Sequence, residues 1–186
     1  MMTAMRAVAW LFAVGWTVFW LYWLIAAFPM KRGRVLWSRE LRIRPVIAVA
    51  VIALVRVGAF RHSTETGDMW RAGLGLLLLA SGLSLAVWAR VHLGRNWGTP
   101  MTQKDDPELV TSGPYRFVRH PIYSGLLLAG VGTAVGVSWV WLIAVALAGV
   151  YFVYSATVEE SFLTERFPDA YVQYKSSTKM LVPFVF

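Results

Sequence analysis

The sequence predicts an all-α, multi-pass integral membrane protein with about five transmembrane helices, forming one membrane domain over residues 1–186. Hydrophobic residues make up 58% of the chain and charged residues only 15%, against about a quarter charged in soluble proteins. The charges are confined to short stretches between long uncharged runs. The chain has no Cys, which excludes a disulfide scaffold, and its three His lie apart without ligand spacing, so no metal site is expected.

Residues 1–89 contain three apolar runs that we interpret as transmembrane spans. Residues 7–30 are 24 consecutive uncharged residues, enough to cross a hydrocarbon core of about 30 Å. Positive charge follows this run and, apart from Arg6, does not precede it, so we expect a retained span and not a signal peptide. Residues 45–60 are interrupted by Arg56, which is expected to snorkel to the membrane surface. Residues 72–89 form the third span.

Residues 121–158 form a run of 38 uncharged residues. As one helix this run would be about 57 Å long, nearly twice the thickness of a bilayer. Residues 136–138 (Gly-Val-Ser) supply a break, so we expect two short helices packed as a tight hairpin. Gly132 and Gly136 have the small-xxx-small spacing that lets a neighbouring helix approach closely. The hairpin brings the number of predicted spans to five.

Five spans would place residues 31–44, 90–120 and 159–186 on one side of the membrane. These segments contain 14 of the 18 Lys and Arg residues. The positive-inside rule then predicts an N-out, C-in protein, and a bacterial inner membrane is the expected location. The net charge of +8 is accounted for by cytoplasmic segments, so we expect membrane lipids and no nucleic acid among its partners.

A polar segment precedes the hairpin at the predicted cytoplasmic surface. Gly113-Pro114 is a turn signal, and Pro121 suits the first residue of a helix because its missing N–H would be unpaired there. His120 would stand at the helix N-terminus beside Arg119, where free N–H groups and the helix dipole favour a carboxylate or phosphate. A second interpretation makes both side chains interfacial anchors that contact lipid phosphates.

Two adjacent carboxylates, Glu159 and Glu160, follow the hairpin. At the cytoplasmic end of an apolar helix the dipole is negative, so acidic residues are locally unfavourable there. A cationic partner is therefore expected, either a ligand or the side chains of Arg119, Arg116 or Lys175. The residues beyond the pair recur at helical spacing and are expected to pack: Phe162, Leu163, Phe167, Tyr171 and Tyr174.

Three sequence strings carry a family resemblance: GRNW at residues 94–97, LVTSGPYRFVRHPIYSG at residues 109–125, and EExxLxxxFxxxYxxY at residues 159–174. Together they resemble the isoprenylcysteine carboxyl methyltransferase family and the related phospholipid N-methyltransferases. The resemblance covers residues 90–186. It implies a catalytic half with hairpin 121–158 and a cytoplasmic tail, which uses S-adenosylmethionine (SAM) to methylate a lipophilic acceptor. The chain lacks the glycine-rich loop after a strand that a Rossmann methyltransferase would show.

The resemblance also implies site residues. Arg119 and Glu160 are the implied catalytic residues. Arg119 could hold an acceptor carboxylate, and either Glu160 or His120 could act as a base if the acceptor is an amine. The implied SAM-contacting positions are Leu109, Val110, Tyr115, His120, Pro121, Ile122, Tyr123, Glu159 and Glu160.

The sequence leaves the acceptor open. Prenylcysteine-type members carry a basic residue about four positions before the acidic pair, and Ser155 occupies that position here. This argues against a prenylcysteine carboxylate unless Arg116 or Arg119 holds it. A lipid amine and a small thiol are the other acceptors to compare. A non-enzymatic membrane protein, such as a helper subunit or carrier whose basic loops bind anionic lipid, is the alternative function. For Arg95, Asn96 and Trp97 two roles stand open, a lid over the site and simple loop packing.

Overall fold

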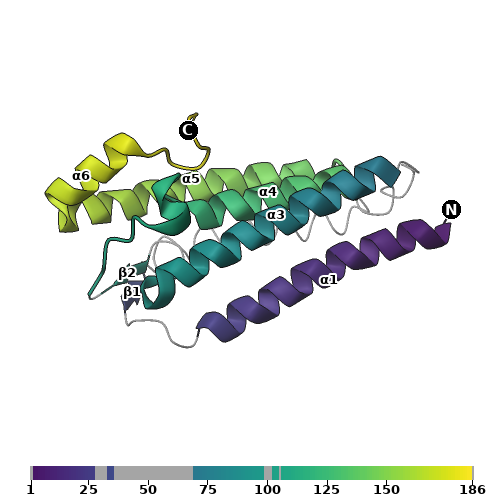
Figure 1. The fold of residues 1–186 in the computed structure, drawn as a ribbon, viewed down its shortest axis with the longest axis horizontal. Helices are drawn as coiled ribbons and strands as arrows, with labels where there is room; N and C mark the ends of the chain where they lie inside the picture. Colours follow the sequence, from purple (N-terminus) through teal and green to yellow (C-terminus); the bar gives the residue numbers. More distant parts are fainter. Residues whose placement is uncertain (1, 28–32, 36–68, 99–101, 105, 186) are drawn as a thin grey trace.

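The computed structural model describes residues 2–27, 33–35, 69–98, 102–104 and 106–185. Figure 1 shows the long helices side by side along the long axis of the protein, with a short helix at one end. The predicted helical architecture is confirmed for the described residues. Their helices are α1 (Met2–Ala27), α3 (Met69–Leu93), α4 (Pro121–Gly136), α5 (Trp141–Arg166) and α6 (Pro168–Ser177).

Within the described part of the chain, three segments are helical, long and apolar enough to cross a membrane: Ala7–Ala27, Met69–Asn96 and Trp141–Arg166. The first two match the predicted spans at 7–30 and 72–89, so the multi-pass architecture is confirmed. α4 is apolar but has only 16 residues, about 24 Å of helix. The predicted span at residues 45–60, with Arg56, lies outside the described residues, so the total of five spans stays a prediction.

The uncharged run from residue 121 to residue 158 folds as the predicted hairpin. α4 ends at Gly136, and α5 begins at Trp141 after a short turn. The expectation of two short helices was wrong, because α5 has 26 residues and continues to Arg166. Glu159 and Glu160 therefore lie within α5 and not in its last turn. The helix dipole, which acts within the terminal turn, does not make this pair unfavourable.

α3 and α4 approach each other through glycine. A methyl group on Gly82 would lie 2.5 Å from the carbonyl oxygen of Gly125, and one on Gly75 would lie 2.6 Å from Cα of Gly136 and 2.7 Å from the carbonyl oxygen of Gly132. These distances are shorter than any van der Waals contact, so only a residue without a side chain permits this approach. The predicted close packing at Gly132 and Gly136 is confirmed: α3 lies against both residues, and Phe12 of α1 also contacts Gly136.

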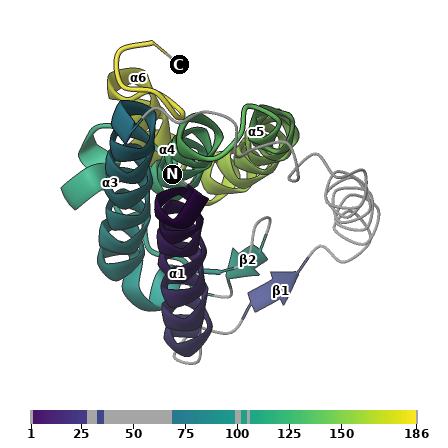
Figure 2. The ribbon, with the colours of Figure 1, turned by 90° about the vertical axis from the view of Figure 1, so that its right-hand side faces the viewer.

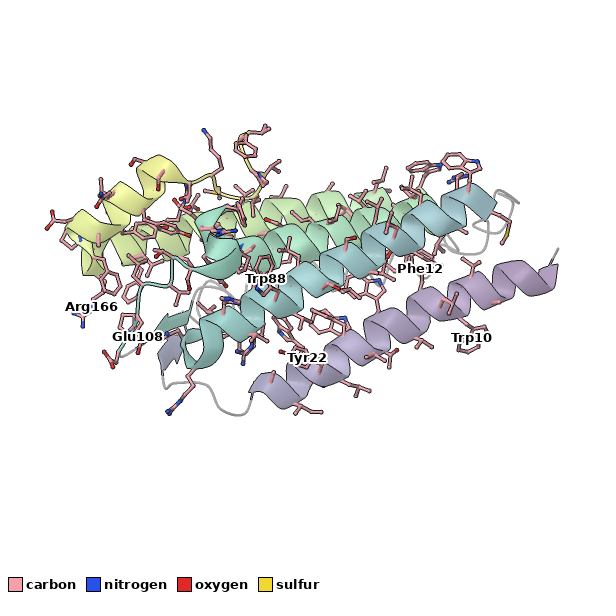
Figure 3. The ribbon with its side chains drawn as sticks, in the orientation of Figure 1. Trp10, Phe12, Tyr22, Trp88, Glu108 and Arg166 are labelled. Atoms are coloured by element: carbon pink, nitrogen blue, oxygen red, sulfur yellow. The ribbon has the colours of Figure 1, made fainter. Side chains whose placement is uncertain are left out.

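α1 packs against this pair along one face. Phe12 is 3% exposed, whereas Trp10 is 70% exposed, and Figure 3 shows Phe12 on the side of α1 that faces the other helices and Trp10 on the outer side. The indole nitrogen of Trp16 donates a hydrogen bond to the hydroxyl of Thr133 on α4 at 3.0 Å. The exposed apolar side of α1 suits contact with lipid chains.

Short polar elements gather at one end of the helix bundle (Figures 1 and 2). Strands β1 (Gly33–Val35) and β2 (Thr102–Lys104) pair antiparallel there, beside the 3₁₀ turns η1 (Gly94–Asn96) and η2 (Gly113–Arg116). The sheet corrects the purely all-α prediction, because strands of three residues are too short to show an alternating pattern. All these elements come from the segments that the predicted topology placed together.

Candidate active site

The N-terminus of α4 positions His120 as predicted. Pro121 is the first residue of the helix and His120 is its N-cap, with no capping hydrogen bond from its own side chain. The His120 ring is stacked on Tyr123 with centroids 5.5 Å apart, and Tyr123 is stacked on Phe152 of α5 at 4.5 Å. His120 and Tyr123 are both buried. This aromatic stack fixes the ring of His120 against the second helix of the hairpin.

Glu160 is surrounded by basic side chains. Its Oε1 lies 2.7 Å from Nε of Arg119 and 3.3 Å from Nε2 of His120, and its Oε2 lies 2.8 Å from Nζ of Lys175. The Glu160 side chain is 3% exposed and that of Lys175 is 51% exposed. We call these four residues the Glu160 cluster. They confirm the expectation that Arg119 and Lys175 accompany the acidic pair, whereas the guanidinium of Arg116 lies over the ring of Phe117 at 4.5 Å.

Glu159 has different surroundings. Its Oε1 accepts a hydrogen bond from the Tyr123 hydroxyl at 2.6 Å, and its Oε2 lies 3.5 Å from Nδ1 of His120. The Glu159 side chain is 26% exposed, against 3% for Glu160. The two carboxylates thus contact opposite nitrogens of one imidazole ring, and Glu159 keeps the larger solvent-facing surface.

The segment at residues 178–181, which we call the C-terminal segment, lies along the entrance to α4. The backbone N–H groups of Arg119 and His120 donate to the carbonyls of Lys179 and Met180 at 2.8 and 3.0 Å, and Val118 and Lys179 form a parallel bridge. The hydroxyl of Ser124 donates to the Leu181 carbonyl at 2.5 Å. The Arg119 guanidinium also donates to the carbonyl of Thr178. The C-terminal segment therefore holds the backbone on both sides of the helix start.

Tyr115, in η2, is buried in the apolar cluster that also contains Ile122 and Tyr123. Gly113 has φ of +59° and a methyl group there would collide with the His92 ring, so glycine is needed at this turn. The hydroxyl of Tyr174 on α6 donates to the Tyr115 carbonyl at 2.6 Å. Burial raises the pKa of the Tyr115, Tyr171 and Tyr174 hydroxyls above the usual range, so these groups stay protonated at neutral pH.

The remaining predicted positions lie around the start of α4. Ile122 and Tyr115 are buried members of one apolar cluster, and Val110 packs against that cluster from the preceding loop. Leu109 is half-buried. The structure thus brings most of the predicted site residues to the meeting point of η2, α4, α5 and the C-terminal segment.

Trp97 packs within the loop. It is buried and meets Trp23 of α1 edge to face at 5.4 Å. The Arg90 guanidinium lies over the Trp97 ring at 4.5 Å and donates to the carbonyls of Gly94 and Ala26. The packing alternative is confirmed for Trp97. Sequence reasoning did not find the role of Arg90, because a charge at the end of an apolar run looks like an ordinary interfacial anchor.

Asn96 extends this packing toward the polar loop, since its amide donates to Glu108 Oε2 at 3.1 Å. Sequence reasoning also missed the C-terminal segment, whose pairing with residues 118–120 depends on backbone groups and leaves no pattern in the side chains. Among the described residues, no group of three or more His, Asp or Glu side chains could hold a metal ion. The chemistry available here is charge recognition and hydrogen bonding by His120, Tyr123 and the two carboxylates.

Comparison with known proteins agrees with this arrangement. A family model described as phospholipid methyltransferase matches residues 70–170. That range includes nearly all of α3, the hairpin and the start of α6, and therefore contains every site residue that the sequence predicted, while Lys175 and the C-terminal segment lie beyond it. The comparison covers more than half of the chain.

Curated relatives extend the similarity. A probable protein-S-isoprenylcysteine O-methyltransferase of Oryza sativa subsp. indica is 31% identical over 190 residues, covering 98% of this chain and 99% of the relative. Protein-S-isoprenylcysteine O-methyltransferase B of Arabidopsis thaliana is 33% identical over 62% of this chain and 61% of its own length. Methanethiol S-methyltransferase 1 of Bradyrhizobium diazoefficiens is 37% identical over 42% of this chain and 27% of its own length. The chain therefore belongs to the phospholipid methyltransferase family of membrane methyltransferases, together with the isoprenylcysteine O-methyltransferases.

Proposed function

We propose that this membrane methyltransferase uses SAM and methylates a lipophilic acceptor that reaches the site from the bilayer. The observation that carries the proposal is the meeting of His120, Tyr123 and Glu159 where the two helices of the hairpin come together. The site lies at one end of the apolar bundle, and we propose that a water-soluble cofactor and an acceptor dissolved in lipid meet at that end.

The residues fit the polar groups of SAM. The cofactor would present an ammonium group, for which the partly exposed carboxylate of Glu159 is a suitable partner. It would also present a carboxylate, which suits the α4 N-terminus and the buried His120. Nε2 of His120 lies 3.3 Å from Oε1 of Glu160 without a hydrogen bond to it, and this contact places the buried ring beside the α4 N-terminus. Leu109, Val110, Tyr115, Pro121 and Ile122 would surround the less polar parts.

When bound, SAM supplies the methyl group, so the protein needs chiefly to align the acceptor and exclude water. A carboxylate or thiolate acceptor would need no base, whereas an ammonium group would first have to lose a proton. The resemblance implies Arg119 and Glu160 as catalytic residues, Arg119 for holding an acceptor carboxylate and Glu160 for accepting that proton. Because ion pairs within the protein occupy both side chains, we favour His120 as the base for an amine acceptor. Ser155, on the face of α5 one turn before Glu159, is fully buried and carries no charge, which favours an uncharged or amine head group over a carboxylate.

A binding experiment tests the cofactor assignment. SAM or its demethylated product, added to the detergent-solubilised protein, should raise the melting temperature by mass action. His120→Ala and Glu159→Gln should reduce that rise, whereas Arg95→Ala, in an exposed part of η1, should not. An unchanged melting temperature at saturating SAM would reject the proposal and favour a non-enzymatic membrane protein.

A labelling experiment tests the acceptor class. The purified protein is incubated with methyl-labelled SAM and three acceptors in detergent: a prenylcysteine, phosphatidylethanolamine and an alkyl thiol. Transfer to the thiol or the amine, and not to the prenylcysteine, is the expected outcome. Preferential transfer to the prenylcysteine would contradict the interpretation of Ser155 but leave the cofactor assignment intact.

A further inference from the structure

We infer that the two adjacent carboxylates have separate tasks, and that Glu160 is a positioning residue that fastens α6 and the C-terminal segment over His120, while Glu159 is the carboxylate that faces the cofactor. This inference rests on the proposed function, because it assigns roles within the same site. It replaces direct contact between Glu160 and a ligand with contacts inside the protein.

The surroundings of Glu160 leave little for a ligand to bind. Both of its oxygens face basic side chains within 3.3 Å, and these come from two places in the chain: Arg119 and His120 at the start of α4, and Lys175 on α6. The side chain is 3% exposed. A ligand ammonium would have to displace one of these cations and leave its charge without a partner, which is costly at a buried site.

The Glu160 cluster is connected directly to the backbone of the C-terminal segment. The Arg119 guanidinium, fixed by Glu160 at 2.7 Å, also donates to the carbonyls of Thr178 and Lys175. Its own N–H donates to Lys179, and the N–H of His120 donates to Met180. One carboxylate thus holds the Arg119 side chain and the Lys175 ammonium in the positions that keep α6 and the C-terminal segment against the start of α4.

The position of His120 depends on these contacts. Its backbone is held by Met180, and its ring is held between Glu160 at Nε2 and Glu159 at Nδ1. If Glu160 lost its charge, the C-terminal segment would leave its place more often, and only molecules with the segment in place would bind the cofactor well. The apparent dissociation constant and KM for SAM would rise by the inverse of that fraction, while kcat would change little.

Hydrogen exchange at the amides of Arg119 and His120 tests the contact without any cofactor. In the full-length, detergent-solubilised protein, Glu160→Gln should speed exchange at these amides by about tenfold or more, because a buried ion cluster loses its only anion. Lys175→Met should have a smaller effect in the same direction and Lys175→Arg should restore slow exchange. The exposed Lys179→Met is the matched control and should leave exchange unchanged. Unchanged exchange in both Glu160→Gln and Lys175→Met would overturn the inference.

Binding and kinetics with SAM supply the second measurement. Lys175→Met should raise KM for SAM several-fold at nearly constant kcat, and saturating demethylated product should return the exchange of Arg119 and His120 to the slow wild-type rate. Slow exchange combined with abolished binding in Glu160→Gln would show direct ligand contact and overturn the inference. If the wild-type protein binds no SAM, the proposed function fails, but the exchange experiment still decides whether Glu160 fastens the C-terminal segment. If Glu160→Gln does not fold, the comparison of Lys175→Met with Lys175→Arg provides the test, because the Lys175 side chain is exposed.

Discussion

The hydroxyl of Tyr123 connects the two helices of the hairpin. It donates to Glu159 on α5 at 2.6 Å, while its ring lies between His120 and Phe152. Tyr123→Phe would keep this stack and remove only the hydrogen bond that orients the Glu159 carboxylate. We expect the affinity for SAM to fall by about tenfold with little change in stability. Isothermal titration of the solubilised protein measures this, with Tyr154→Phe, whose residue is exposed, as the control; equal affinities in both variants would contradict the role of the hydroxyl.

The buried tyrosines of α6 predict a dependence of stability on pH. Burial, with a smaller contribution from Glu160, raises the pKa of Tyr171, and burial raises that of Tyr174. The unfolded chain therefore releases these protons first, so the stability is fully present below about pH 10 and decreases as the pH rises above that value. Melting temperatures between neutral and strongly alkaline pH measure this.

Tyr171→Phe tests the origin of this dependence. The Tyr171 hydroxyl has no hydrogen-bond partner among the described residues, so its removal should cost little at pH 7 and should make the alkaline decrease smaller. Lys175→Met is the control for the lysine that contacts Glu160 at the same end of the protein. A decrease of the same size in wild type and in Tyr171→Phe would show that another group is responsible.

For single residues, the sequence predicted which side chains would be candidates for the site better than it predicted their contacts. His120, Tyr123 and Glu159 could be predicted because turn signals, a helix-starting proline and a family resemblance all mark them. The backbone carbonyls of Thr178 and Lys179 could not, because main-chain acceptors are the same for every residue type. Arg90 was missed for a related reason: whether an arginine snorkels or binds carbonyls depends on which helix end lies beside it.

The contact between α3 and α4 depends on residues that have no side chain. Gly82→Ala would place a methyl group 2.5 Å from the backbone of Gly125 and Ala129, so the helices would have to separate. We expect a loss of about 1–3 kcal/mol in the free energy of unfolding. Gly73→Ala on the same helix is the control, since nothing lies within 4 Å of the added group, and it should be neutral or slightly stabilising. Thermal unfolding in detergent measures both, and equal melting temperatures would show that the helices can shift apart freely.

The helices of the hairpin illustrate what hydropathy can and cannot predict. The break near Gly136 was predictable from length, because 38 uncharged residues exceed any single span. The continuation of α5 to Arg166 was not, because residues 159–166 are polar and hydropathy marks where the apolar run ends, not where the helix ends. Helix formation beyond the membrane depends on packing against α6 and the ion pairs of Glu160, which are tertiary contacts.

The whole molecule places its polar elements at one end, and the predicted orientation assigns this end to the cytoplasm. Because the chain has no Cys, single introduced cysteines report position without background. Ser177→Cys on α6 should react with a membrane-impermeant maleimide only after the cells are permeabilised, whereas Ser138→Cys in the turn between α4 and α5 should react in intact cells. The reverse pattern would invert the N-out, C-in topology.

The C-terminal segment has a consequence for how the protein is made. Residues 178–181 are synthesised after both helices of the hairpin, yet they supply the carbonyls that hold Arg119 and His120. A growing chain can therefore insert its apolar helices before the contacts at Arg119 and His120 are complete. Membrane integration and completion of the proposed site then become separate events in time.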